Sequence, residues 1–334
     1  MALAEQRRLD REAGLAEIEA RTRAGLVRVE DSLAAAVASS DPFVHEAAGH
    51  LIGAGGKRFR ATCVLLAGHF GDPDEPNLVP AAVAIELTHV STLYHDDVLD
   101  QADLRRGTRS ANARWGNQLA ILTGDYLFAR ASEVTAGLGS DATRILARTI
   151  ARLVQGQIAE ARGPGDGLDP VEHYMTVLAD KTGALIGTAC RLGGQLAGAE
   201  PPEVAALTEF GERVGVAFQL GDDLLDLADG SKRSGKAPGT DLREGVRTLP
   251  VLYLLRAGGP DAELVSKVLD ADSPGSEAVA EARAVLRASE AFTEAHRAAQ
   301  AQVDLAKSSL DALPDGPARD ALERVADQVL DRDR

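Results

Sequence analysis

The chain has little cysteine, few aromatic residues and an excess of acidic side chains. Cys63 and Cys190 are the only cysteines among 334 residues, which excludes a disulfide framework or a cysteine-rich zinc site and favours a reduced, cytoplasmic setting. Lys and Arg number 36 against 51 Asp and Glu, so we expect no nucleic-acid partner. No apolar run reaches the roughly 18 residues of a membrane span, so we expect no integral membrane segment.

The dominant period of the sequence is helical. Ala, Leu, Arg and Glu are abundant, and the alternating apolar runs typical of strands are scarce. Apolar spacing predicts long helices over residues 79–100, 118–136, 141–160, 172–198, 203–229 and 276–312. The Gly-, Pro- and Asp-rich stretches between them are too short to link separate domains. We therefore expect an all-α fold, a single large helical bundle that spans residues 1–334 as one domain.

Two copies of the pattern Asp-Asp-x-x-Asp stand in apolar sequence. Their residues are Asp96, Asp97, Asp100, Asp222, Asp223 and Asp226. The first and last aspartates of each copy are four residues apart, so they share a helix face at a cost of about 0.2–0.5 kcal/mol per like-charged pair. Oxygen ligands without nearby Cys or paired His favour Mg²⁺, with Mn²⁺ as the alternative. Because Mg²⁺ combines one or two carboxylates with substrate phosphates, the two copies indicate a metal-held diphosphate; a single copy is typical of a solvated face.

Basic residues stand close to the first acidic motif. Gly55 and Gly56 precede Lys57 and Arg60 where a helix is expected to begin, and a glycine turn at a helix N-terminus favours phosphate. Arg105 and Arg106 follow the motif and suggest phosphate clamps. The alternatives are a solvated turn for the first group and a surface ion pair with Asp103 for the second.

Two further polar residues align with the acidic motifs on their helices. His89 lies seven residues before Asp96 on the same face, although a lone histidine there is often structural. Gln219 lies three and four residues before Asp222 and Asp223. Both residues therefore join the candidate site.

Six segments of the chain, in this order, resemble the trans-isoprenyl diphosphate synthase family, the polyprenyl synthetases. They read GGKRFR, HVSTLYHDDVLDQADLRRG, DKTGALI, FQLGDDLLD, GK and TLP, and they span residues 55–250. The resemblance implies an isoprenoid-synthase fold around a deep central cavity, and a homodimer. It also implies head-to-tail condensation of isopentenyl diphosphate with an allylic diphosphate, either farnesyl or geranylgeranyl diphosphate.

By match to the family's motifs, the resemblance implies a role for each candidate residue. About three Mg²⁺ ions per site would be held by Asp96, Asp100 and Asp222, with Asp97, Asp223 and Asp226 in support. The allylic diphosphate would be clamped by Arg105, Lys181 and Lys236. Isopentenyl diphosphate would be held by Lys57, Arg60, His89 and Arg106. Developing positive charge would be stabilised by Thr182 and Gln219.

Three small residues before the first motif bear on product length. The family closes its product tunnel with bulky aromatics at this level, whereas this chain has Thr88, Ser91 and Thr92 in a stripe directed toward the core. An open floor predicts a product of about 30–50 carbons, as in quinone side chains, with transient membrane contact for product release. Deeper side chains, such as those of Ile121, Leu122 or Phe128, would instead close the tunnel and give a short-chain synthase of about 15–20 carbons.

Two other classes and one departure from the family stay open. A class I terpene cyclase shares the first acidic motif but usually mixes Asn, Ser and Glu in the second. A non-catalytic subunit typically loses acidic positions, and this chain keeps all six. Val246 stands where the family often has a lysine, with Arg247 beside it, which puts one diphosphate contact in doubt.

Overall fold

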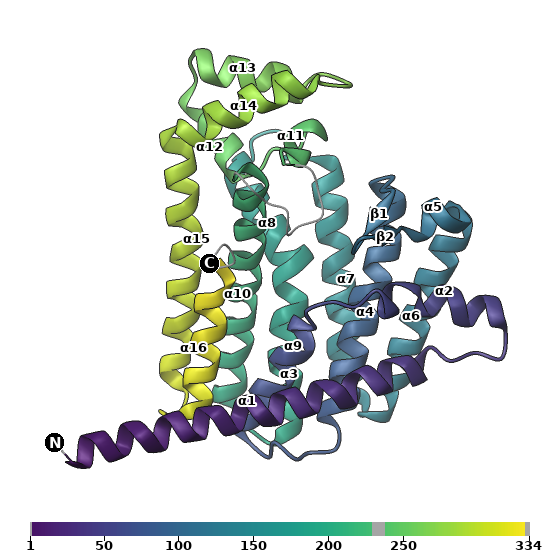
Figure 1. The fold of residues 1–334 in the computed structure, drawn as a ribbon, viewed down its shortest axis with the longest axis vertical. Helices are drawn as coiled ribbons and strands as arrows, with labels where there is room; N and C mark the ends of the chain where they lie inside the picture. Colours follow the sequence, from purple (N-terminus) through teal and green to yellow (C-terminus); the bar gives the residue numbers. More distant parts are fainter. Residues whose placement is uncertain (1, 229–237, 331–334) are drawn as a thin grey trace. The chain divides into compact units, whose positions relative to one another are not determined.

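The structure is a computed structural model that describes residues 2–228 and 238–330, and these residues are overwhelmingly helical (Figure 1). The helical elements are α1 (Ala2–Ala36), α2 (Pro42–Gly53), α3 (Phe59–Ala67), η1 (Gly68–Phe70), α4 (Leu78–Leu99), α5 (Ala111–Trp115), α6 (Asn117–Gly137), α7 (Ser140–Arg162), α8 (Pro170–Leu178), the π-helical turn η2 (Ala179–Gly183), α9 (Ala184–Ala197), α10 (Pro201–Leu227), α11 (Thr240–Arg243), α12 (Leu249–Ala257), α13 (Pro260–Leu269), α14 (Ser276–Ala288), α15 (Glu290–Ser309), η3 (Leu310–Ala312) and α16 (Pro317–Leu330). An antiparallel hairpin, β1 (Leu104–Arg105) and β2 (Thr108–Arg109), supplies the only strands of the described residues. The all-α prediction is confirmed.

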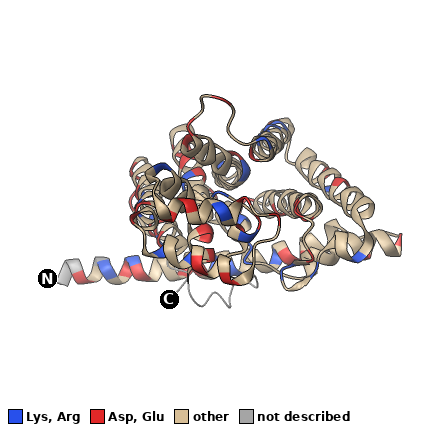
Figure 2. Cartoon of the chain, turned by 90° about the horizontal axis from the view of Figure 1, so that it is seen from above, with Lys and Arg blue, Asp and Glu red and all other residues tan. Residues whose placement is uncertain are grey.

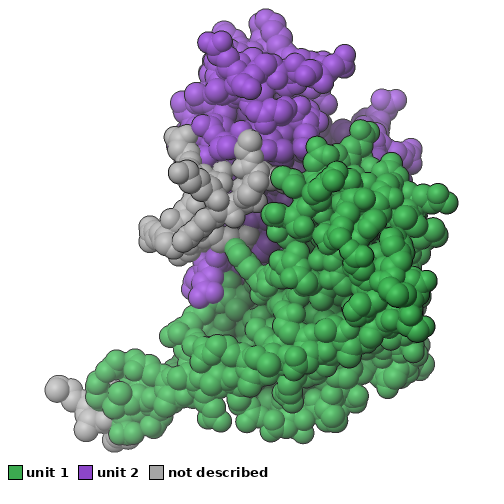
Figure 3. Space-filling model, turned by 45° about the vertical axis from the view of Figure 1, so that its right-hand side comes forward, with its two compact units in different colours: residues 1–151, 185–211, 309–325 green, residues 152–184, 212–308, 326–334 purple. Residues whose placement is uncertain are grey.

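Two compact units make up the chain, coloured green and purple in Figure 3. Unit 1 comprises Met1–Ala151, Leu185–Gly211 and Ser309–Val325. Unit 2 comprises Arg152–Ala184, Glu212–Ser308 and Ala326–Arg334. A single domain over residues 1–334 and a deep central cavity both stay predictions.

Unit 1 is organised around α4, which packs along α6 (Figure 1). Residues 81–88 of α4 are all buried, and they are apolar except for Glu86 and Thr88, as expected of a helix that is buried on every side. Ile85, Leu87 and Leu127 are fully buried, which contributes about 1.5–3 kcal/mol for each side chain. The Tyr94 hydroxyl is buried with them and donates to the Ala47 carbonyl at 2.5 Å. This packing fixes the helix whose C-terminal end carries the first acidic motif.

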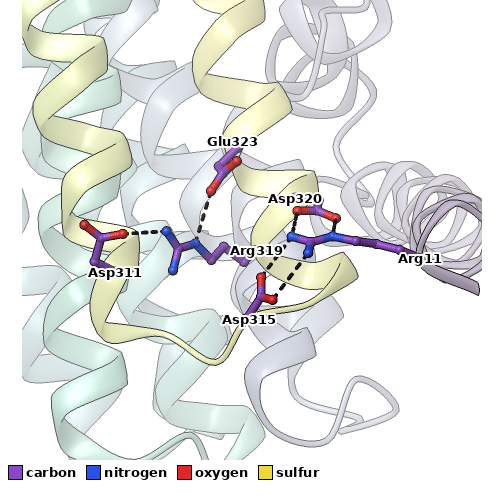
Figure 4. Close-up of polar contacts among 6 residues, drawn as sticks. All are labelled: Arg11, Asp311, Asp315, Arg319, Asp320 and Glu323. Carbon is purple, nitrogen blue, oxygen red and sulfur yellow. Dashed lines mark hydrogen bonds and ion pairs between the residues drawn. The ribbon is translucent and has the colours of Figure 1, made fainter. Parts of the chain in front are cut away.

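Ion pairs tie the long helix α1 to the last helices of unit 1. Arg11 pairs with Asp315 at 2.9 Å and also with Asp320, and Arg319 reaches Asp311 and Glu323 (Figure 4). Figure 2 shows acidic and basic residues side by side along the N-terminal turns of α1. Exposed pairs contribute at most about 1 kcal/mol each, so packing rather than charge supplies most of the stability.

Unit 2 buries the inner face of α10 against α12 and α15. Val216, Leu220 and Leu224 share a core cluster with Leu249 of α12 and with small residues of α15. A second cluster holds α11 to α14 together, and α13 and α14 lie side by side (Figure 1). The buried leucines of α10 thereby hold the turn that carries the second acidic motif.

Two of the expected helices are interrupted in the structure. The helix expected over 276–312 breaks at Ser289, whose backbone is extended at φ −82° and ψ 157° and whose hydroxyl donates to the Leu286 carbonyl at 2.6 Å. The helix expected over 172–198 contains the π-helical turn η2 between α8 and α9. Single-turn π-helical segments often occur at functional sites, and this one contains Lys181 and Thr182.

Candidate active site

The first acidic motif lies at the C-terminal end of α4, in unit 1. Asp96 is half-buried, and Asp100, directly after the last helical residue, is exposed and donates its backbone N–H to the Asp96 carbonyl at 2.8 Å. The last turn of α4 contains no basic residue, and the C-terminal end of a helix carries partial negative charge. Two carboxylates at this position repel each other and the helix end, so the arrangement favours a bound cation.

Asp97, in the same motif, is fully buried and has a different environment. Its Oδ1 accepts a hydrogen bond from Arg105 Nε at 2.6 Å, and its Oδ2 has no hydrogen-bond partner among the described residues. Burial raises the pKa of Asp97, while the Arg105 guanidinium opposes that rise. Arg105 therefore pairs with Asp97 rather than with Asp103, and the pair joins the hairpin to the end of α4.

Arg58 fixes the glycine-rich turn before α3. Its side chain is buried, with the backbone in the left-handed region at φ 46°. Its guanidinium donates to Glu30 at 2.6 and 2.9 Å and to the Ile52 carbonyl at 3.0 Å, and it lies 3.7 Å from the buried Glu86 of α4. Glu86 also accepts the Ala61 N–H, in the first turn of α3, at 3.1 Å. Arg58 thus holds the turn, a role that sequence reasoning missed although the residue stands inside the quoted motif.

The cations predicted to bind isopentenyl diphosphate gather around this turn. Lys57 is exposed, and Arg60 is half-buried in the first turn of α3. Arg106 donates to the Leu51 carbonyl at 2.7 Å and reaches Gly56, where an added side-chain carbon would lie 3.2 Å from the guanidinium carbon. This glycine therefore allows the close approach of Arg106.

His89 of α4 faces the same group of cations. Burial lowers its pKa well below 6.5, and the charges of Arg60, Arg106 and Arg105 lower it further. The imidazole is therefore neutral near pH 7 and can donate one hydrogen bond. Burial and the neighbouring Arg58 also lower the pKa of Arg106. Like charges that lower the pKa of Arg106 favour an anion beside them, and a phosphate group fits this requirement.

The second acidic motif lies at the C-terminal end of α10, in unit 2. Asp222 and Asp226 are half-buried, and the last turn of α10 contains no basic residue. Asp226 is bound to the backbone, because its carboxylate accepts the N–H of Thr240 at 3.2 Å and of Asp241 at 3.0 Å. It therefore caps α11. Asp222 is the first aspartate of the second motif and corresponds to Asp96 in the first motif.

Asp223 is the buried aspartate of the second motif, as Asp97 is of the first. The Tyr174 hydroxyl donates to its Oδ2, and Gln219 Nε2 donates to its Oδ1 at 3.1 Å. Burial raises the pKa of Asp223 to about 8, against the opposing effect of these two hydrogen bonds. Thr182 Oγ1 completes the chain by donating to Gln219 Oε1 at 3.4 Å. Sequence reasoning missed Tyr174, although its position seven residues before Lys181 is a helical spacing.

The π-helical turn η2 is held by charged side chains on both sides. Lys181 Nζ lies 2.6 Å from Glu160 of α7. Arg152 of α7 pairs with Asp180 of the turn at 2.6 Å and with Glu212 of α10. These ion pairs hold the turn that places Thr182 Oγ1 at 3.4 Å from Gln219 Oε1, and they were not expected from the sequence.

The three residues predicted to form an open tunnel floor differ in their surroundings. Thr88 and Ser91 are fully buried, and the Ser91 hydroxyl donates to the Gly124 carbonyl of α6 at 2.7 Å. Helix packing thus encloses both side chains, and their role in setting product length stays a prediction. Thr92 is half-buried and keeps an accessible surface. Ile121 and Leu122 are 42% and 55% exposed, so they do not close a tunnel within unit 1.

Two further predicted contacts concern the segment after α10. Lys236 lies outside the described residues. Arg247 pairs with Asp270 at 2.9 Å and Val246 is exposed, so the guanidinium is directed at α13. This pairing argues against Arg247 as the substitute for the missing lysine.

The carboxylates present fit a divalent cation that shares its coordination with a ligand. Among the described residues, no three His, Cys, Asp or Glu side chains form a metal-binding group. Mg²⁺ needs only one or two carboxylates when phosphate oxygens complete its shell, and each helix end supplies such a carboxylate set.

Within the described helices, none combines the length and apolarity needed to cross a membrane.

The chain is similar to known proteins over most of its length. Residues 41–286 match the family model for polyprenyl synthetase. A nonaprenyl diphosphate synthase from Mycobacterium tuberculosis is 44% identical over 320 residues, which is 96% of each chain. A heptaprenyl diphosphate synthase component 2 from Geobacillus stearothermophilus is 41% identical over 92% of this chain and 96% of that protein. The crystal structure of a geranylgeranyl pyrophosphate synthase from Corynebacterium glutamicum, complexed with calcium and isoprenyl diphosphate, gives a TM-score of 0.84 at 42% identity over 95% of this chain and 97% of that one.

An all-helical fold with two carboxylate motifs at helix ends, and cationic residues before α3 in the same unit as the first motif, is typical of enzymes that handle diphosphates. With these similarities over nearly its whole length, the chain belongs to the polyprenyl synthetase family and is a prenyltransferase.

Proposed function

We propose that the enzyme condenses isopentenyl diphosphate head-to-tail with farnesyl or geranylgeranyl diphosphate to give a trans-polyprenyl diphosphate of about 30–50 carbons. The observation that carries the proposal is the pair of acidic motifs, each with a buried aspartate held by a neighbour and with Asp96, Asp100 or Asp222 partly or fully exposed at a helix end. The cationic residues Lys57 and Arg60 of unit 1 also support the proposal, because they offer a second diphosphate site and a terpene cyclase does not need one.

The accessible aspartates would hold about three Mg²⁺ ions. Asp96, Asp100 and Asp222 supply the carboxylates, and the bound ions supply positive charge that makes the allylic diphosphate a better leaving group. Arg105 and Lys181 bind the same diphosphate, together with Lys236. Asp97 keeps Arg105 in place at 2.6 Å, and Glu160 does the same for Lys181.

Thr182 and Gln219 stabilise the allylic carbon as its bond to the diphosphate breaks. Oxygen atoms directed at a developing positive charge lower the barrier when they are oriented beforehand. Lys57, Arg60, His89 and Arg106 hold isopentenyl diphosphate so that its double bond attacks that carbon, and positioning supplies much of the rate. The proton then lost from the product passes to the released diphosphate. Water must stay excluded, because it would trap the cation.

The proposed product length has two supports. Thr92 is small and accessible, and the relatives named above include nonaprenyl and heptaprenyl diphosphate synthases. A product of about 15–20 carbons is the alternative, and the similarity to a geranylgeranyl pyrophosphate synthase favours it.

We also propose that the enzyme works as a homodimer. Leu119, Ile121 and Leu122 of α6 are 36%, 42% and 55% exposed, and neighbouring apolar side chains on a helix surface are typical of an interface. Sedimentation velocity should give the mass of a dimer. A monomer at micromolar concentration would contradict this part of the proposal.

A product assay with the full chain tests the proposed reaction. Purified protein is incubated with Mg²⁺, isopentenyl diphosphate and either allylic primer, and the dephosphorylated products are sized by mass spectrometry. We expect a ladder that ends above 30 carbons and is abolished by EDTA. A ladder that stops at 15 or 20 carbons would keep the reaction and refute the length. Cyclic hydrocarbon as the product would refute the reaction as proposed. Elongation only after a different partner protein is added would also refute it, and the similarity to a protein named component 2 is the reason to test for that outcome.

A further inference from the structure

We propose that Tyr174 is a positioning residue that acts through Asp223 to fix the orientation of the Gln219 amide for the ionisation step. This inference rests on the proposed function. Tyr174 lies on α8, and Asp223 and Gln219 lie on α10, so all three belong to unit 2.

The two oxygens of Asp223 bind two different donors. The Tyr174 hydroxyl occupies Oδ2, and the Gln219 NH₂ group donates to Oδ1 at 3.1 Å. Because only the nitrogen end of the amide can donate, Gln219 Oε1 must point the other way, where Thr182 Oγ1 donates to it at 3.4 Å. The oxygen end carries the partial negative charge that stabilises a developing cation, whereas a flipped amide would present its N–H hydrogens.

The Tyr174 hydroxyl is what keeps Asp223 in this arrangement. Because the hydroxyl is bonded to Oδ2, Oδ1 is the oxygen that accepts from Gln219. Asp223 is only 7% exposed, so without the hydroxyl its Oδ2 would be buried with no donor. A buried unsatisfied oxygen is unfavourable, and rotation of the carboxyl group toward the Gln219 NH₂ relieves it. Such a rotation moves the amide from its working orientation.

Packing supplies a matched control for this hydroxyl. The rings of Tyr174 and Tyr253 both pack against the core cluster that contains Leu178, Leu220 and Leu249. Tyr253 makes no hydrogen bond to a described residue. Tyr174→Phe and Tyr253→Phe therefore remove the same atom from two rings that pack against one core cluster, and only the first removes a contact with Asp223.

Steady-state kinetics of the full-length enzyme test the inference, with isopentenyl diphosphate and farnesyl diphosphate as substrates. For Tyr174→Phe we expect kcat to fall at least tenfold, while KM for each substrate stays within twofold. For Tyr253→Phe we expect both constants to stay within twofold of the wild type. A purely structural role for Tyr174 would lower the thermal stability or the active fraction of Tyr174→Phe and leave kcat per active enzyme within twofold of the wild type. Tyr174→Met, which also fills the core without a hydroxyl, repeats the test if Tyr174→Phe does not fold.

A double-mutant cycle shows whether Tyr174 acts through Gln219. In the Gln219→Ala background, Tyr174→Phe should change kcat by less than twofold, because there is no amide left to orient. If the double variant shows the product of the two single-variant losses in kcat, the inference is overturned. A wild-type kcat in Tyr174→Phe, or an equal loss of kcat in Tyr253→Phe, would also overturn it. A wild-type enzyme that does not elongate would instead refute the proposed function.

Discussion

Replacing Arg58 by methionine should destabilise the turn that carries Lys57 and Arg60. Methionine fills part of the same volume but removes the guanidinium, which is buried and donates to Glu30 at 2.6 Å. Glu86, 2% exposed and 3.7 Å from that guanidinium, is then left buried without its cation. Removal of one partner from a buried ion pair costs about 3–5 kcal/mol, and we expect the free energy of unfolding to fall by this amount.

Urea unfolding followed by circular dichroism measures the loss. Arg58→Met with Glu86→Gln should recover part of it, because no buried charge is then left unpaired. Arg144→Met breaks an exposed pair with Asp141 and should cost less than about 1 kcal/mol. A loss in Arg58→Met no larger than in this control, or a double variant less stable than the single one, would refute the reasoning.

Three further predictions concern the acidic motifs and product length. Burial raises the pKa of Asp223 to about 8, so the folded protein keeps a proton that the unfolded chain loses near pH 4. Relative to Asp223→Asn, the metal-free wild type should therefore lose up to about 1.4 kcal/mol of unfolding free energy per pH unit between about pH 4 and 8; parallel urea-derived curves would contradict this. Arg105→Ala leaves Asp97 buried without its cation and should lower the free energy of unfolding at pH 7 by up to about 3–5 kcal/mol, measured by urea unfolding. Adding Asp97→Asn should restore most of the loss, and an unchanged midpoint would exclude the pair as a stabilising contact. Thr92→Phe should shorten the longest product detected by mass spectrometry. Ser91→Phe should instead lower Tm, because Ser91 is packed against α6. A shorter product from Ser91→Phe and a lower Tm for Thr92→Phe would show that Ser91 lines the tunnel.

Local periodicity accounts for the parts of the fold that could be predicted from the sequence. Apolar spacing predicts helices over 79–100 and 203–229, and α4 and α10 occupy Leu78–Leu99 and Pro201–Leu227. The four-residue spacing of the outer aspartates needs only a helix, so it could also be predicted. The break at Ser289 could not be predicted, because residues 276–312 keep a helical period while the backbone is extended at this one residue.

The environments of the site residues depend on other elements and could not be read from spacing. Nothing in the spacing separates Asp97 and Asp223 from surface aspartates, yet both are buried, and they accept hydrogen bonds from Arg105 of the hairpin and Tyr174 of α8. Asp226 is occupied by the first amides of α11, a segment that follows it by 14 residues. Arg247 looks available in the sequence, yet it pairs with Asp270 at the end of α13.

Metal-dependent binding of an allylic diphosphate tests the central claim most directly. Calorimetry would measure the affinity of the full-length enzyme for farnesyl thiolodiphosphate, which does not ionise readily, with Mg²⁺ or with EDTA. We expect binding that requires Mg²⁺ and is weakened at least tenfold by Asp96→Asn and by Asp222→Asn individually. Equal affinity in EDTA, or wild-type affinity in both variants, would contradict a diphosphate held through the two acidic motifs.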